Sequence, residues 1–196
     1  LHDDDHYVTA RDMAKISKAA LENETFRYVA CKPNYYIAPT NKDKHGKELW
    51  NHHKMVKRTM FNYDGVEGGK TGYTTKAGGT LVTFAKRGDQ ELIVVDLCAH
   101  GYELYEDTIK MLNYGFNNYK TIAPFKTMNT VLKDDTYGFL KTGNELSPYK
   151  IPLKHLNDVT VMLEKKQSAS KLTYKCKDNK YIISYDGKQI GSVKLH

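Results

Sequence analysis

The first thirty residues carry a hydrophobic pattern typical of helices. Apolar side chains recur at helical spacing from Met13 to Leu21, directly after Thr9, whose hydroxyl can cap the start of a helix. This pattern predicts an amphipathic helix over residues 10–22. A second short helix is expected from Asn23 to about Ala30, because Asn is also a favourable capping residue.

The middle of the chain is dominated by strand patterning. Residues 31–65 hold turn-forming Pro, Asn and Gly between short apolar patches, so we expect loops with brief strands. Three strand-like runs follow between Gly68 and Ala99, with Arg87–Asp89 as a hairpin turn. The continuous apolar run Leu92–Val95 is typical of a strand buried on both faces. Helical spacing over residues 102–119 predicts a helix that packs on these strands.

A change of pattern after Tyr119 indicates a second domain. Residues 121–196 show no helical period, and short β-type runs are separated there by turn residues, including a hairpin signal at Asp186–Gly187. We therefore expect an α+β fold, with an antiparallel sheet and a covering helix in residues 1–120. A small all-β domain is expected in residues 121–196.

The composition excludes several classes of protein. With 196 residues and 40% hydrophobic content the chain can form a real core. Its net charge of +7 comes from lysines interleaved with acidic residues along the chain, rather than from a basic stripe, so we expect no nucleic-acid partner. A weak attraction to anionic surfaces such as a cell envelope is the safer inference. No apolar run reaches the roughly 18 residues that span a bilayer.

The cysteines and histidines do not indicate a metal or a disulfide framework. Cys31, Cys98 and Cys176 are odd in number and widely spaced, so we interpret them as ordinary buried thiols. The histidines lack metal-ligand spacing, and we expect neither a metal site nor another cofactor.

The tripeptide Lys70-Thr71-Gly72 is the strongest candidate for chemistry. It lies in GVEGGKTGYTTKAGG, on a predicted strand that leads into a hairpin and a helix. A second Lys-Thr-Gly at 141–143 lies in a Gly-, Asn- and Pro-rich stretch of the β module, and we interpret it as a turn. A purely structural interpretation of the first copy is also available, because lysines on edge strands discourage aggregation and glycines mark turns.

The context of this tripeptide resembles a known family. GVEGGKTGYTTKAGGTLVTFAKRGDQELIVVDLCAHG, followed by DTIKMLNYGFNNY, looks like the second half of the penicillin-recognising domain of serine-type D-alanyl-D-alanine carboxypeptidases. These are the low-molecular-mass penicillin-binding proteins of peptidase family S11. DHYVTARDMAKISKAAL is similar to the preceding segment, and the all-β residues 121–196 suit the C-terminal module of this family. The resemblance implies part of a β-lactamase/transpeptidase-like domain in residues 1–120.

The resemblance implies a role for each residue of this strand. Lys70 would place a cation beside the nucleophile and the substrate carboxylate, and Thr71 would hydrogen-bond that carboxylate. Gly72 would let an extended substrate lie against the strand. The backbone N–H of Tyr73 would be an oxyanion donor, and Thr74 would line the same edge. The catalytic candidates are thus Lys70 and Tyr73, and the substrate-binding candidates are Thr71, Gly72 and Thr74.

Other motifs of the family are missing or altered. The sequence holds no Ser-x-Asn, and its Ser-x-x-Lys at Ser168 lies in the β module, downstream of the Lys-Thr-Gly, as does a second match at Ser147. The chain is therefore expected to begin after the nucleophile. Gly69 stands where the family usually has an apolar residue and should loosen the strand. His52 lies near a position that is often basic in the family, but a structural histidine is the expected interpretation.

These observations predict an exported enzyme of the cell envelope. The expected activity is removal of the terminal D-Ala from peptidoglycan stem peptides through an acyl-enzyme, with β-lactams as inhibitors, and this chain alone is expected to be inactive. The alternative is a non-catalytic cell-wall binding or scaffold protein with a degenerate penicillin-binding fold. The apolar strand Glu91–Cys98 is expected at a sheet edge, covered by an N-terminal fragment of the same protein or by a second copy.

Overall fold

The computed structural model divides into two compact units. It describes residues 3–56, 60–124, 130–132, 137–142, 145–146, 151–152, 159–178 and 180–194. The first unit is Leu1–Phe116 and the second is Asn117–His196, so the division lies close to the boundary expected after residue 120. Helices and antiparallel sheets together give an α+β fold.

Two short helices open the first unit, and both begin as the sequence predicts. Helix α1 spans Ala10–Leu21, and the hydroxyl oxygen of its N-cap, Thr9, accepts the backbone N–H of Asp12 at 3.1 Å. Helix α2 spans Glu24–Ala30, and the Asn23 side chain accepts the N–H of Phe26 at 3.0 Å. These caps satisfy amide groups that have no partner within the helix.

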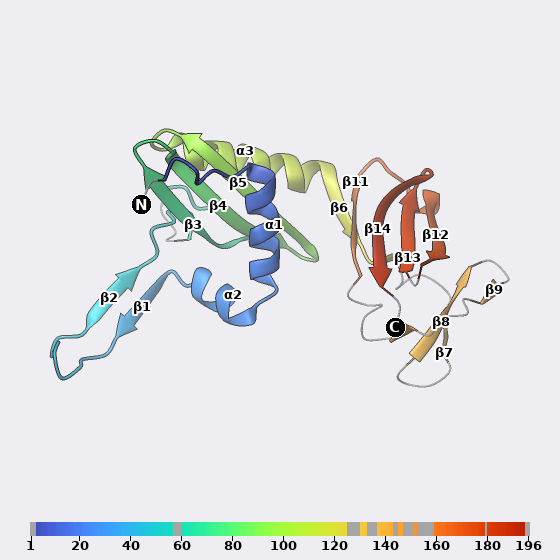
Figure 1. Ribbon diagram of the computed structural model, residues 1–196, viewed down its shortest axis with the longest axis horizontal. Coiled ribbons are helices and arrows are strands. Elements are labelled where there is room, and N and C mark those ends of the chain that lie inside the picture. Colours follow the sequence, from blue (N-terminus) through green and yellow to red (C-terminus); the bar gives the residue numbers. More distant parts are fainter. Residues whose placement is uncertain are drawn as a thin grey trace. The chain divides into compact units, whose positions relative to one another are not determined.

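The loop-rich region after α2 forms one hairpin. Strand β1, Asn34–Ile37, pairs antiparallel with β2, Lys47–Trp50. The side chains of both strands are exposed. Figure 1 shows this hairpin extending away from the helices and the sheet of the first unit.

A three-stranded antiparallel sheet forms the centre of the first unit. Its order is β3 (Val66–Thr74), β4 (Gly78–Arg87) and β5 (Gln90–Ala99). Helix α3, Glu103–Asn118, lies on one face, and α1 and α2 lie on the other (Figure 1). The core between the sheet and α3 includes Leu81, Ala85, Val94, Leu104, Leu112 and Phe116.

Burial within this sheet corrects one expectation. Leu92–Val95 was expected to be buried on both faces, but only Val94 of this run is buried in β5. The strand with two buried faces is β4, where Leu81 faces the core beneath α3 and Phe84 contacts Phe26 of α2 on the other side. The reason is position, because β4 is central and β5 has a strand neighbour only at β4 among the described strands.

The second unit is built from short strands. β6 (Tyr119–Ile122) pairs with β11 (Val161–Glu164), and a three-stranded sheet has the order β12–β13–β14. Its hairpin at Asp186–Gly187 is the predicted one, and both residues adopt positive φ. The remaining elements are β7 (Thr130–Leu132), β8 (Tyr137–Thr142), β9 (Glu145–Leu146), β10 (Ile151–Pro152), a 3-10 helix at Ala169–Lys171, β12 (Leu172–Lys177), β13 (Lys180–Tyr185) and β14 (Lys188–Lys194).

The core of this unit, in the residues whose burial is described, is a single cluster. Its buried members are Val161, Leu163, Leu172, Tyr181 and Ile183. No helix in the described part of the chain combines the length and the apolarity needed to cross a lipid bilayer.

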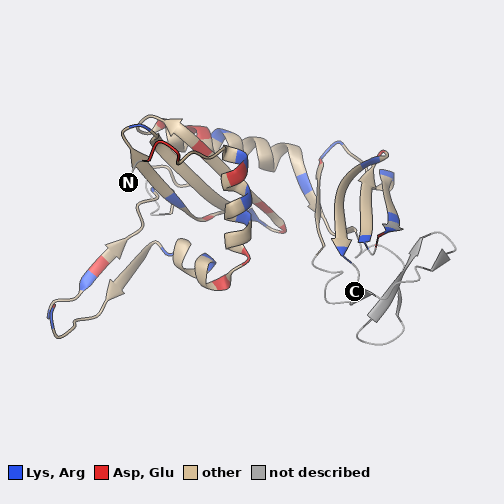
Figure 2. Ribbon diagram, viewed as in Figure 1, with Lys and Arg blue, Asp and Glu red and all other residues tan. Residues whose placement is uncertain are grey.

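The two units differ sharply in charge, which corrects the expectation that the excess lysines are spread over the chain. Residues 1–116 contain 16 basic and 16 acidic residues, whereas residues 117–196 contain 14 lysines, no arginine and seven acidic residues. Figure 2 shows both charges over the first unit and mainly Lys on the strands of the second. The whole net charge of +7 therefore belongs to the second unit.

Candidate active site

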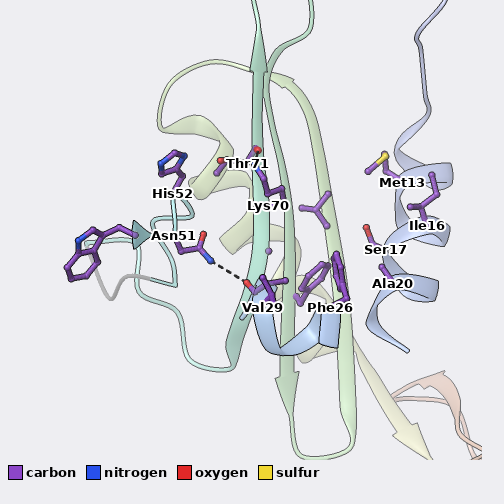
Figure 3. Close-up of a pocket in the computed structure, with 15 residues that line it drawn as sticks. Met13, Ile16, Ser17, Ala20, Phe26, Val29, Asn51, His52, Lys70 and Thr71 are labelled. Carbon is purple, nitrogen blue, oxygen red and sulfur yellow. Dashed lines mark hydrogen bonds between the residues drawn. The ribbon is translucent and has the colours of Figure 1, made fainter. Parts of the chain in front are cut away.

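A pocket of about 530 Å³ opens in the first unit, on the face of the sheet that carries α1 and α2. Figure 3 shows α1 on one side of it and Lys70 with Thr71 of β3 on the other. Most of the wall is apolar. It is lined by Met13, Ile16, Ser17, Ala20, Phe26, Val29, Ala30, Trp50, Asn51, His52, Gly69, Lys70, Thr71, Val82 and Phe84.

The predicted site residues divide into two groups. Lys70 and Thr71 line the pocket, and the exposed Lys70 ammonium donates to the backbone carbonyl of Thr71. Gly72, Tyr73 and Thr74 lie beyond the pocket lining. The side chain of Tyr73 is 75% exposed, and the Thr74 hydroxyl accepts the N–H of Ala77 at 3.1 Å in the turn to β4. The structure thus brings two of the five together at the pocket.

The two glycines before Lys70 allow close packing on both faces of β3. A Cβ at Gly68 would lie 2.7 Å from the carbonyl oxygen of Ala30 and from Sγ of Cys31, at the end of α2. At Gly69 it would collide with the carbonyl oxygen of Val82 and lie 2.7 Å from the ring of His53. Such distances leave no room for a side chain.

The structure gives Gly69 a packing role, and the expected loosening of the strand stays a prediction. The lack of a side chain at Gly69 lets His53 and β4 approach the backbone closely. The segment before Lys70 is held between α2 on one side and His53 on the other.

His53 is a part of the site that the sequence did not reveal. Its side chain is fully buried, Nε2 lies 2.9 Å from the hydroxyl of Thr83, and the ring meets Tyr105 of α3 edge-on. Burial lowers the pKa of His53 to about 4. The imidazole is therefore neutral at pH 7. It packs against β3 at Gly69.

The neighbouring residues of the loop after β2 have other roles. His52, expected to be structural, is exposed and lines the pocket, so the structural histidine is His53. The Asn51 side chain donates to the carbonyl oxygens of Ala30 at 3.3 Å and Lys32 at 3.1 Å, and it accepts the N–H of His53 at 2.9 Å. Asn51 thus joins the end of α2 to this loop.

The other motif copies belong to the second unit, and none of their residues is among those that line this pocket. Lys141 and Thr142 end β8, while Gly143 lies outside the described residues. The Ser168 hydroxyl lies 2.8 Å from that of Ser170, and the Lys171 ammonium pairs with Asp186 at 3.3 Å. The Lys171 ammonium is therefore engaged with a carboxylate, while only the Lys171 backbone N–H contacts the serine of its motif, at the Ser168 carbonyl.

The thiols are more exposed than the sequence predicts. Cys31 is only partly buried and Cys98 is exposed, so the expectation of buried thiols is wrong for both, while the Cys176 side chain lies outside the description. Burial, and then the nearby Glu67, raises the pKa of the Cys31 thiol. Among the residues that the structure describes, no three His, Cys, Asp or Glu side chains form a group that could hold a metal ion.

Comparison with known proteins identifies the family of this chain. The D-alanyl-D-alanine carboxypeptidase family, peptidase S11, matches residues 1–101. D-alanyl-D-alanine carboxypeptidase DacF of Bacillus subtilis is 28% identical over 201 residues, covering 100% of this chain and 48% of the relative. DacC of Escherichia coli is 32% identical over 121 residues, covering 61% of this chain and 28% of the relative. The chain thus spans about half or less of the length of these relatives.

Solved structures agree with this assignment. A variant of the Streptomyces K15 DD-transpeptidase is similar with a TM-score of 0.54 and 29% identity, over 59% of this chain and 45% of that chain. Penicillin-binding protein 5 of Haemophilus influenzae matches 100% of this chain and 57% of its own, with a TM-score of 0.64 and 23% identity, which supports the fold. The chain belongs to the D-alanyl-D-alanine carboxypeptidase family, peptidase S11.

Proposed function

We propose that this chain contributes the Lys-Thr-Gly wall of an exported serine-type D-alanyl-D-alanine carboxypeptidase that trims peptidoglycan stem peptides. The observation that carries the proposal is that Lys70 and Thr71 line the pocket, within the residues that match the family. The serine nucleophile would come from a segment outside these 196 residues, because both Ser-x-x-Lys matches in this sequence, at Ser147 and Ser168, belong to the second unit.

The reaction would proceed by acyl transfer. The serine Oγ attacks the carbonyl carbon between the two D-alanines, the C–N bond breaks, and the terminal D-alanine leaves as the free amino acid. Water then hydrolyses the ester and regenerates the serine. A β-lactam would acylate the same serine and remain attached.

Each residue of β3 would contribute a separate interaction. The Lys70 ammonium now donates to a carbonyl of its own strand, and it would turn to the substrate carboxylate and the nucleophile. The Thr71 hydroxyl would hydrogen-bond the carboxylate. Gly72 would let the substrate backbone approach the strand. The Tyr73 N–H would stabilise the oxyanion, and Thr74 would border the substrate while it holds the turn.

The open apolar surface around the pocket supports a covering segment. Ile16, Val29 and Trp50 line the pocket and remain 57%, 64% and 52% exposed. Among the described strands β5 has a neighbour only on its β4 side. Another polypeptide segment can bind to an exposed apolar surface, and it can also pair with an open strand edge. We propose that an N-terminal part of the same protein, or else a second copy, covers Glu91–Cys98.

Covalent labelling with a fluorescent penicillin tests the proposal. The 196-residue chain alone should form no stoichiometric adduct, whereas the natural full-length protein should form one. In the full-length protein, Lys70→Ala should slow acylation by about 10²–10³-fold, as loss of an electrostatic contact to the developing charge does. Gly69→Ala should also slow it, because the new methyl group must displace His53 or β4.

Lys76→Ala is the matched control. Lys76 follows the same strand, is exposed and pairs with Asp4 at 2.7 Å, so its loss should leave the acylation rate unchanged. A stoichiometric adduct on the 196-residue chain would refute the missing nucleophile. A full-length protein that binds cell wall but forms no adduct would be the non-catalytic scaffold. A monodisperse, fully folded monomer of this chain would refute the covered edge.

A further inference from the structure

The sheet β12–β13–β14 carries a row of three directly opposed lysines. Lys177 of β12 pairs with Lys180 of β13, and Lys180 pairs with Lys194 of β14. Directly paired residues lie on the same face of a sheet, and Lys175, two residues before Lys177, shares that face. All four side chains are exposed. Figure 2 shows these strand ends in blue, side by side.

This lysine face, Lys175, Lys177, Lys180 and Lys194, lies opposite the core of the second unit. Tyr181 and Ile183 alternate with Lys180 along β13, and both are buried in that core. The side chain of Lys180 must therefore point to the other side of the sheet. The face is thus a surface of the unit and not part of its interior.

The four lysines lack acidic partners within the described residues. No ion pair or side-chain hydrogen bond involves them there, whereas Lys171 of the same unit pairs with Asp186. Asp178, in the turn between β12 and β13, brings one negative charge close in sequence. Like charges directly opposite one another destabilise a sheet, so this arrangement is unfavourable for the fold by itself. Bound anions would offset this repulsion.

The other residues of the lysine face indicate which kinds of anion it can bind. They are Thr173, Ile182, Ser184, Gln189 and Ser192, with no aromatic ring among them. Single-stranded nucleic acids use aromatic rings to stack bases, and proteins that insert into membrane interfaces use Trp or Phe. The second unit also has no arginine for bidentate recognition of single phosphates. A row of point charges instead fits an extended chain of single negative charges.

We propose that the lysine face binds an extended phosphodiester polymer that carries no bases. The polymer lies across the three strands, and its successive phosphates are neutralised by the ammonium groups of the row. Binding of this kind releases counterions and weakens steeply with salt. The proposal does not depend on the carboxypeptidase function, because it uses no residue of the first unit.

Titration of the full 196-residue chain with fluorescent poly(glycerol phosphate) tests this surface. The triple variant Lys177→Gln, Lys180→Gln, Lys194→Gln should lose about tenfold or more in affinity at low salt. Its log–log salt slope should fall by about 2, since each contact with a flexible single chain contributes about 0.7. Thermal unfolding of the variant should show a second unit as stable as before or more stable, because opposed like charges have been removed.

The matched control removes three lysines from the first unit. Lys42, Lys44 and Lys47 are exposed in and beside the turn of the β1–β2 hairpin, and their change to Gln alters the net charge equally. This control should retain the affinity and slope of the parent chain. Equal losses in the two triple variants would overturn the proposal in favour of a net-charge effect. Tighter binding to oligothymidylate, or to phosphatidylglycerol vesicles, would overturn it in favour of nucleic acid or lipid.

Discussion

The two units differ in what their surfaces leave unsatisfied. In the first unit charges balance, and Arg27 of α2 pairs with Glu67 at 2.9 Å and Glu91 at 2.8 Å, while apolar side chains remain exposed around the pocket. In the second unit the described core holds five buried residues, and the outer face of the β12–β13–β14 sheet carries lysines that form no ion pair with a described residue. We therefore expect the first unit to bind a partner that buries its exposed apolar side chains. We expect the second unit to bind an anion at its lysine face.

The largest expected effect tests whether the units unfold separately. Leu112 is fully buried beneath the first sheet and Ile183 is 1% exposed in the second core. Leu112→Ala should destabilise the first unit by about 2–5 kcal/mol, and Ile183→Ala should do the same for the second. Calorimetry of the full chain should show each substitution lowering a different transition. A single transition lowered by both substitutions would show that the two units unfold together.

The next effect concerns pH and is confined to the first unit. Because the folded pKa of His53 is about 4 and the unfolded value is near 6.5, the unfolded chain binds the extra proton between these values. Stability is therefore complete above pH 6.5 and falls as the pH drops towards 4, by about 3 kcal/mol for this group.

The variant His53→Asn isolates this dependence. It should be less stable at pH 7 but should lose less stability on acidification, as measured by denaturant titration at several pH values. The transition of the second unit serves as the internal control, because His53 is the one buried histidine in the described part of the chain. An unchanged pH profile in the variant would show that another group is responsible.

The smallest expected effects compare the charges of the two units directly. Arg27→Gln breaks partly exposed ion pairs and should destabilise the first unit by about 1 kcal/mol or less. Lys180→Thr relieves like charges on both sides and should stabilise the second unit by about 0.2–1 kcal/mol. Unfolding in high salt should shrink both differences, since salt screens exposed charges. Effects of the same sign would contradict the proposed contrast.

Local features of this fold could be predicted from the sequence. The caps at Thr9 and Asn23, the helical spacing of α3 and the Asp186–Gly187 hairpin depend on residues a few positions apart. Hydrogen bonds over such short separations form in the same way whatever surrounds them. The Lys-Thr-Gly strand was also placed correctly, because alternating residues and a following turn are local signals.

Features that depend on distant residues could not be predicted. The role of Gly69 depends on His53 and Val82, which come close only when the loop after β2 packs behind the sheet. Nothing distinguishes His52 from His53 in the sequence, yet one is exposed and the other has no exposed surface. The burial of β4 rather than β5 follows from strand order, which hydrophobic runs do not encode.

The glycine pair before Lys70 also limits how this strand can change by mutation. Every amino acid that one base change can introduce into a glycine codon carries a Cβ. At Gly68 that atom would meet the end of α2, and at Gly69 it would meet His53 and the Val82 carbonyl. An amino-acid substitution at either position therefore shifts the strand that bears Lys70. Variation that preserves this site must accumulate around these two positions and not at them.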